Sequence, residues 1–339
     1  MIFWWLLLLT SIGSWVLTGL LRRYALAKNL IDVPNDRSSH SMPTPRGGGV
    51  AIVVSFLAVL PGLNYVDWVS TPICIALGGA GLIVALTGFL DDHGHIRARW
   101  RLLVHFGAAA WGLYWLGGFP PLTGLGLFPE WLGYLCAAIY FVWLLNLYNF
   151  MDGIDGLAGL EAIIVCSSGA LLSWLVAPDL NTWMLPALLA TAVSGFFAWN
   201  FPPARIFMGD AGSGFLGLML ALLSVQATEF HPQLFWVWLL LMGVFIVDAT
   251  VTLCRRVLFG EKFYEAHRSH AYQYASRAIG SHRSVTLAIG AINIFWLLPI
   301  ASLVALEKLN GGLGLTVAYL PLLWLAFYYK AGDRQAQMD

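Results

Sequence analysis

Long runs of apolar residues alternate along the chain with short connectors that are polar or rich in Gly and Pro. About 20 mostly apolar residues suffice for a helix to cross the hydrocarbon core of a bilayer. The pattern therefore predicts an all-α integral membrane protein with about eleven transmembrane helices. The predicted spans cover approximately residues 1–21, 48–68, 71–90, 102–119, 131–148, 157–177, 183–200, 213–228, 234–254, 285–306 and 313–329.

The composition excludes a water-soluble enzyme. Apolar residues make up 59% of the chain, charged residues 11%, and the mean hydropathy is +0.74, whereas soluble domains carry about 25% charged residues. The 18 Lys and Arg balance the 18 Asp and Glu, so no basic surplus is available for a nucleic acid, and none is expected as a partner. The four cysteines have no short paired spacing, which argues against a disulfide framework or a zinc site.

The distribution of basic residues predicts how the chain is oriented. If the spans alternate through the bilayer, one side receives residues 22–47, 91–101, 149–156, 201–212, 255–284 and 330–339. Seventeen of the 18 Lys and Arg lie there, all except Lys308. The positive-inside rule makes this side cytoplasmic, with the N-terminus periplasmic, the C-terminus cytoplasmic and the active site formed by cytoplasmic loops. We expect one membrane domain over residues 1–330, to whose site the loop 255–284 contributes, followed by a cytoplasmic tail at 331–339.

Five aspartates lie where predicted spans meet this side. Asp91 and Asp92 end the third span, Asp152 and Asp155 follow the fifth, and Asp210 follows the seventh in a Gly-rich turn. Each alone is compatible with a solvated helix end, because a charge placed there avoids the cost of the bilayer centre.

Their combination predicts a cation site. Several ionised carboxylates brought together repel one another unless a cation joins them. Oxygen ligands select Mg²⁺, with Mn²⁺ as an alternative, and Mg²⁺ usually takes one or two protein carboxylates while phosphate oxygens and water complete its shell. Glycines such as Gly209 and Gly156 lead into the following spans, whose helix N-termini favour a phosphate. The predicted substrate is therefore a phosphate or a diphosphate.

Two basic stretches complete the predicted site. Residues 32–49 are too rich in Pro and Gly for a helix and include Arg46, which is typical of a binding loop. Within residues 255–284, the basic side chains of His267, Arg268 and His270 fall within four residues and can grip a diphosphate. The alternative for this loop is a juxtamembrane patch that attracts anionic lipid heads. His105 and Asp248 lie inside spans and are interpreted as polar residues of helix packing.

Four motifs in this order resemble the polyprenyl-phosphate N-acetylhexosamine-1-phosphate transferase family, of glycosyltransferase 4 type. They are Asp91-Asp92, the segment from Asn146 to Gly159, the segment from Asn200 to Gly214, and His267-Arg-Ser-His270. The resemblance spans residues 1 to about 330. It implies a multi-pass enzyme of the bacterial inner membrane. This enzyme would transfer a sugar 1-phosphate from a UDP-N-acetylhexosamine to undecaprenyl phosphate, release UMP and require Mg²⁺.

The resemblance also implies roles for single residues. Asp210 and Asn149 would bind the metal, and Asp91 and Asp92 would be catalytic. The positions that match the surroundings of the nucleotide, the sugar or the diphosphate are Asp152, Asp155, Asn200, Phe207, His267 and His270, beside Arg268 and Arg46 of the two basic stretches.

The His-Arg-Ser-His loop departs from the better-known members of the family and looks most like the subgroup that initiates O-antigen and lipopolysaccharide glycan synthesis. That subgroup implies UDP-GlcNAc or a 6-deoxy relative such as UDP-FucNAc as donor, while another donor of the family stays an alternative and a homodimer stays open. A secondary transporter would place ionisable groups near the bilayer midplane, where these spans have almost none. A CDP-alcohol phosphotransferase would have Ala-Arg after the Asp-Gly segment, where this chain has Ala158-Gly159.

Overall fold

The computed structural model describes residues 1–34, 42–94, 96–118, 129–261 and 267–333. Over these residues the chain is a bundle of helices with one short antiparallel hairpin, β1 (Ile31–Asp32) and β2 (Thr44–Pro45). The prediction of an all-α integral membrane protein is confirmed. The first helices are α1 (Ile2–Ala27), α2 (Val50–Leu57), α3 (Leu60–Tyr65), α4 (Thr71–His93), α5 (Ala98–Leu116), α7 (Glu130–Met151), α8 (Leu157–Val176) and α9 (Met184–Asn200), with the 3-10 turn η1 (Asn181–Trp183) before α9.

The second half of the chain is more broken. Its helices are α10 (Asp210–Thr228), α11 (Gln233–Leu241), α12 (Gly243–Leu258), α13 (Ala271–Ile279), α14 (His282–Ile292), the π-helical turn η2 (Asn293–Leu297), α15 (Leu298–Ala305) and α16 (Gly311–Tyr328). α11 and α12 meet at an angle of 69°, so the span predicted at residues 234–254 bends near its middle. α14, η2 and α15 continue one another and form the span predicted at residues 285–306.

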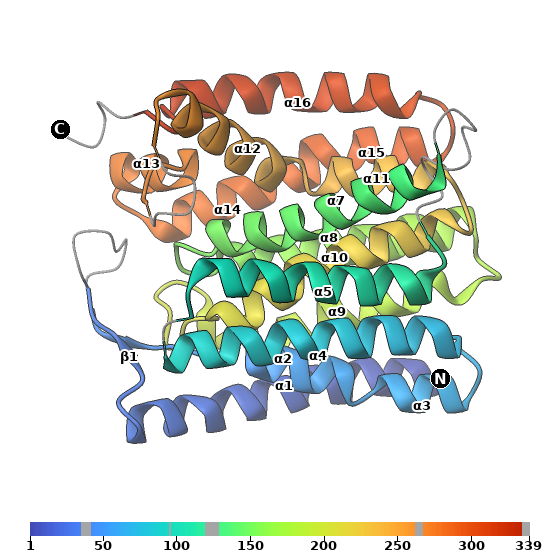
Figure 1. The fold of residues 1–339 in the computed structure, drawn as a ribbon, viewed down its shortest axis with the longest axis horizontal. Helices are drawn as coiled ribbons and strands as arrows, with labels where there is room; N and C mark the ends of the chain where they lie inside the picture. Colours follow the sequence, from blue (N-terminus) through green and yellow to red (C-terminus); the bar gives the residue numbers. More distant parts are fainter. Residues whose placement is uncertain (35–41, 95, 119–128, 262–266, 334–339) are drawn as a thin grey trace.

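The number of spans differs from the predicted eleven. Within the described residues, eight helices are long and apolar enough to cross a membrane, and the bent pair of α11 and α12 makes up to nine. The predicted spans 48–68 and 102–119 do not meet this criterion. The first is divided between the short helices α2 and α3. The second is α5, whose first two turns hold Arg99, Arg101 and His105, although Figure 1 shows α5 lying alongside the long helices.

Helix α10 forms the centre of the bundle. Every residue from Ala211 to Thr228 is buried, and the helix packs most closely against α7 and α4 (Figure 1). Small residues permit this approach: a Cβ atom on Gly88 of α4 would lie 2.4 Å from the backbone nitrogen of Ala211. Because the first residues of α10 touch α4 directly, the glycine at position 88 fixes where Asp210 lies relative to the end of α4.

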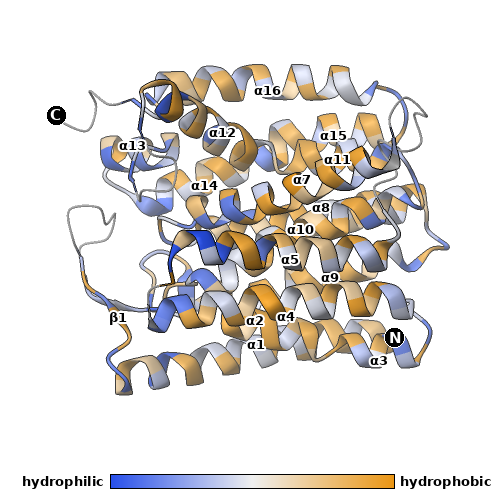
Figure 2. Ribbon diagram, viewed as in Figure 1, coloured by the Kyte–Doolittle hydropathy of each residue, from blue (hydrophilic) through white to orange (hydrophobic). Residues whose placement is uncertain are grey.

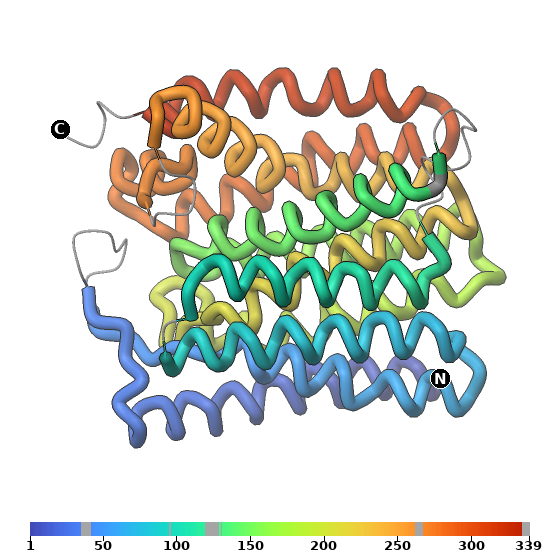
Figure 3. Tube along the Cα trace, viewed as in Figure 1, coloured from blue at the N-terminus to red at the C-terminus, as the bar shows by residue number. Residues whose placement is uncertain are grey.

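The described parts of the connectors predicted on one side gather at one end of the bundle. Figure 1 places β1, α13 and the end of α16 at this end, and Figure 3 shows the chain starting from the opposite end. Hydrophilic residues are dense there, while the middle of the helices is mostly apolar (Figure 2). Hydrogen bonds join the connectors to each other, for example from the amide of Ala204 to the carboxylate of Asp155 at 2.9 Å. The loops that carry the candidate residues thus form one surface.

The contact at Gly88 gives the first prediction. Gly88→Ala should destabilise the protein by about 1–3 kcal/mol, because the added methyl group meets backbone atoms that cannot move aside. The melting temperature in detergent should fall by several degrees. Gly78→Ala is the matched control, since Gly78 lies on the same helix with nothing within 4 Å of its added Cβ. Equal melting temperatures for the two variants would contradict the importance of the contact.

Candidate active site

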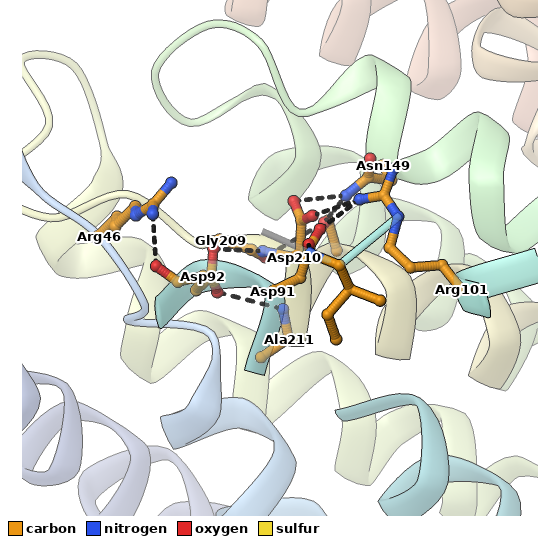
Figure 4. A network of polar contacts seen from close by, with 10 residues as sticks. Arg46, Asp91, Asp92, Arg101, Asn149, Gly209, Asp210 and Ala211 are labelled. Carbon is orange, nitrogen blue, oxygen red and sulfur yellow. Dashed lines mark hydrogen bonds and ion pairs between the residues drawn. The ribbon is translucent and has the colours of Figure 1, made fainter. Parts of the chain in front are cut away.

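Two aspartates from different helices share one cation at the hydrophilic end of the bundle. Asp91 lies in the last turn of α4, and Asp210 is the first residue of α10. The guanidinium of Arg101, from α5, contacts the Asp91 carboxylate and lies 3.2 Å from Asp210 Oδ2 (Figure 4). The Asp91 side chain is 6% exposed and the Asp210 side chain 36%.

Asn149 joins this cluster from α7. Its Nδ2 donates to Asp210 Oδ1 at 2.9 Å and to the hydroxyl oxygen of Ser213 at 2.8 Å. The structure therefore brings Asp91, Asn149 and Asp210 together, as the sequence predicts. The predicted set omitted Arg101, because in the sequence it is one of three arginines in a basic connector that serves equally well as a topology signal.

Asp92 points away from this cation and holds the start of α10. Its side chain is buried, and its two carboxylate oxygens accept from the backbone N–H groups of Asp210 at 3.3 Å and Ala211 at 3.5 Å. Gly209 has φ +77°, and a Cβ there would lie 2.6 Å from Asp92 Oδ2. Asp92 thus places Asp210, while its own carbonyl oxygen accepts a hydrogen bond from Arg46 (Figure 4).

The donor set at Asp91 and Asp210 fits a magnesium ion. Their carboxylates converge on a single cationic group, and Mg²⁺ commonly uses one or two protein carboxylates beside phosphate oxygens and water. No group of three or more His, Cys, Asp or Glu converges as metal ligands among the residues described, so a substrate would have to supply further oxygens. A cavity of about 40 Å³ adjoins the cluster and is lined in part by Arg101, His105, Asn149 and Asp210.

The turn after α7 is tied to the loop before α10. Asp155 accepts from the amide of Ala204 at 2.9 Å and lies 3.3 Å from Nδ1 of His282. Asn200 accepts from the amide of Gly156 at 3.1 Å and donates to the Ile206 carbonyl at 3.0 Å. Asp155 and Asn200 therefore shape the site through backbone contacts, and their proposed approach to a nucleotide stays a prediction.

Asp152 lies in the same turn, directly after α7. Burial raises the pKa of its carboxyl well above the ordinary value, and the negative charges of Asp210, Asp92 and Asp155 raise it further. A cation bound nearby would oppose this shift. The electrostatics thus favour a positive group in front of these acids.

The Arg46 loop lies against the turn before α10. The amide of Phe207 donates to the Pro45 carbonyl at 2.8 Å, and the amide of Gly48 donates to the Phe207 carbonyl at 2.9 Å. These bonds position Phe207 and Arg46 at the same edge of the site as Asp92.

The histidine loop reaches the site from the other half of the bundle. The rings of His267 and His270 stack with centroids 4.9 Å apart, and each lies 6.4 Å from the ring of Phe150, next to Asn149. The Tyr272 hydroxyl donates to the Phe150 carbonyl at 2.9 Å. The structure thus brings His267 and His270 beside the carboxylate cluster. The carbonyl oxygen of Arg268 accepts hydrogen bonds from the guanidinium of Arg277.

Asp248 organises this loop from α12. Its carboxylate accepts hydrogen bonds from the backbone N–H groups of Ala271 and Tyr272, each at 3.0 Å, and lies 3.2 Å from Nδ1 of His270. The interpretation of Asp248 as a residue of helix packing is therefore incomplete. No local sequence signal relates Asp248 to His270. The two residues are 22 positions apart, and only the fold brings them into contact.

Comparison with known proteins agrees with the geometry. The family model of glycosyl transferase family 4 matches residues 74–228. A probable undecaprenyl-phosphate N-acetylglucosaminyl 1-phosphate transferase of Bacillus subtilis is 28% identical, covering 91% of this chain and 86% of that protein. An undecaprenyl-phosphate alpha-N-acetylglucosaminyl 1-phosphate transferase of Thermotoga maritima is 27% identical, covering 86% and 88%. A phospho-N-acetylmuramoyl-pentapeptide-transferase of a Wolbachia from Brugia malayi is 32% identical, covering 64% and 68%.

The environment of His267 predicts a pH dependence of stability. Burial, with the nearby His270 and Arg256, lowers the pKa of His267 to about 3. The unfolded chain takes up a proton on this imidazole below pH about 6.5, whereas the folded protein does not until pH about 3. The free energy of unfolding should therefore decrease as the pH falls from about 6.5 toward 3. Wild type should lose melting temperature more steeply between pH 7 and pH 5 than His267→Gln.

The control for this measurement is His93→Gln, which changes an exposed imidazole and should keep the wild-type slope. Parallel curves for wild type and His267→Gln would show that this imidazole is protonated alike in both states.

Proposed function

Because the chain belongs to the glycosyl transferase family 4 of polyprenyl-phosphate N-acetylhexosamine-1-phosphate transferases, we propose that it transfers an N-acetylhexosamine 1-phosphate from a UDP-sugar to undecaprenyl phosphate and releases UMP. The observation that carries the proposal is the convergence of Asp91 and Asp210 on one cationic group. Asn149 binds Asp210, and its neighbour Phe150 lies 6.4 Å from the rings of His267 and His270. A diphosphate needs such a cation on one side and hydrogen-bond donors on the other. The names of the relatives support a polyprenyl phosphate as acceptor.

We propose Mg²⁺, or Mn²⁺ in its place, as the cofactor of this site. Asp210 and Asp91 would hold the ion, with Asn149 fixing the Asp210 carboxylate. When bound, the ion neutralises charge on the diphosphate. Arg101 holds the two carboxylates together and lies where it can also face a phosphate oxygen. Asp92 keeps Asp210 in place through the backbone of α10.

The reaction we favour is one in-line displacement. An oxygen of the lipid phosphate forms a bond to the β-phosphorus of the donor, the bond between this phosphorus and the bridging oxygen breaks, and that oxygen leaves with UMP. A phosphate monoester has a second pKa of about 6 and is mostly dianionic at pH 7, so the nucleophile needs little help from a base. Residues of the site then act mainly by positioning and by electrostatic stabilisation.

The stereochemistry at phosphorus tests this route. One displacement inverts the configuration of a chiral β-phosphate, whereas a two-step route through an aspartyl-phosphate on Asp91 retains it. We expect inversion, measured on the lipid product made from an isotopically chiral donor. Retention would replace the direct displacement by the covalent route.

The cellular setting is part of the proposal. The basic residues of the connectors support a cytoplasmic site at the bacterial inner membrane. The His267-Arg-Ser-His270 loop supports initiation of O-antigen glycans from UDP-GlcNAc or a 6-deoxy relative such as UDP-FucNAc. The test is purified protein with undecaprenyl phosphate and a panel of labelled UDP-GlcNAc, UDP-GalNAc and UDP-6-deoxy sugars, with and without Mg²⁺. Release of UMP together with a lipid diphosphate product is the expected result, and no turnover with any donor would overturn the function.

Asp210→Ala tests the cation site directly. The variant should lose at least about 100-fold in turnover, because the charge that holds the cation is removed, while membrane insertion and the melting temperature stay close to wild type. Asp179→Ala is the matched control, since Asp179 is an exposed aspartate between α8 and α9. If Asp210→Ala turned over UDP-GlcNAc as fast as Asp179→Ala, Asp210 would have no part in the reaction.

A further inference from the structure

A buried carboxylate on α12 supports the histidine loop. Asp248 Oδ1 accepts from the amide of Ala271 at 3.0 Å and from the hydroxyl of Thr252 at 3.1 Å, and it lies 3.2 Å from Nδ1 of His270. Oδ2 accepts from the amide of Tyr272 at 3.0 Å. The same carboxylate therefore holds the first turn of α13 and one nitrogen of the His270 ring.

This contact determines which ring nitrogen of His270 is available. A carboxylate can only accept, so the proton lies on Nδ1 and Nε2 is left for another partner. The residue is 2% exposed, and Nε2 has no hydrogen-bond partner in the part of the chain that the structure describes. A buried polar atom without a partner is uncommon in a folded protein and points to a missing ligand.

The position of the ring relates this nitrogen to the active site. The His270 ring lies 6.4 Å from the ring of Phe150 and stacks on His267. Phe150 follows Asn149, which binds Asp210, and both Phe150 and Asn149 line the cavity beside Arg101. The side chain of Phe150 thus lies between the His270 ring and the cavity beside Arg101.

We propose that Asp248 is a positioning residue of the transfer reaction and acts through His270, an inference that rests on the proposed function. The carboxylate fixes Nδ1–H and the orientation of the ring. When Nε2 also carries a proton, its N–H donates to a phosphate oxygen of the UDP-sugar. The class of ligand assigned to this nitrogen is a diphosphate.

The loop has a second support that does not involve Asp248. The amide of Gly332, after α16, donates to the Ser269 carbonyl at 2.7 Å, and the Tyr274 hydroxyl donates to the Asp333 carbonyl at 3.1 Å. These bonds keep the backbone of the loop and α13 in place when the Asp248 carboxylate is changed. A substitution at Asp248 is therefore expected to affect the His270 ring more than the fold.

Steady-state kinetics test the proposal. Asp248→Asn should raise the KM for the UDP-sugar about tenfold, a change of ~1.4 kcal/mol, and leave the KM for undecaprenyl phosphate unchanged. Thr252→Val is the matched control, because it removes another donor to the same oxygen without touching His270. His270→Gln should show the same loss, and the double variant should be no worse than either single one. Additive losses, or a donor KM for Asp248→Asn equal to that of Thr252→Val, would overturn the proposal.

A measurement on the unmodified protein covers the case in which Asp248→Asn does not fold. In wild type labelled with ¹⁵N-histidine, the His270 signals, identified by their loss in His270→Gln, should show a protonated Nδ1. UDP-GlcNAc should shift the Nε2 signal. An unprotonated Nδ1, or an Nε2 signal insensitive to a donor that the enzyme turns over, would exclude the role of Asp248. No turnover with any donor would instead refute the proposed function. The Nδ1 signal would still show whether Asp248 and His270 are paired.

Discussion

The repulsion between acidic side chains at the end of a helical bundle is the constraint on which the rest of the site depends. Asp91 and Asp210 come from helices that pack directly, so their carboxylates cannot separate without breaking the α4 and α10 contact at Gly88. A cation must lie between them, and in this structure the cation is the guanidinium of Arg101. The position between the two carboxylates is therefore built for positive charge.

The fully buried helix α10 explains why this arrangement can be rigid. Its N-terminus carries Asp210, and two backbone N–H groups there are bound by Asp92. A helix N-terminus favours negative charge, so this turn stabilises the carboxylate of Asp92. In the other half of the bundle, α12 follows the bend after α11, and its Asp248 contacts His270 of the histidine loop.

The sequence predicted the parts of the site that lie at the ends of apolar runs. Asp91 and Asp210 follow from the positions of the spans, because both lie at helix ends on one side of the bundle. Asn149 follows from the resemblance to the family. Arg101 and Asp248 did not follow, since a basic residue in a connector and an acid in an apolar run have common alternative explanations. Their roles depend on which helices are neighbours, and the period of hydrophobic residues carries no such information. Helix α5, by contrast, is the span predicted at residues 102–119, and it packs beside α4 and α7.

Backbone and side-chain contacts together hold the acids of the site. Backbone N–H groups donate to the carboxylates of Asp92 and Asp155, and the amide of Ile96 donates to Asp91 Oδ1 at 2.7 Å. The guanidinium of Arg101 joins Asp91 to Asp210. The pKa of Asp152 is raised because its carboxyl is buried and because the negative charges of Asp210, Asp92 and Asp155 act on it. Positive charge brought near these acids would oppose that shift.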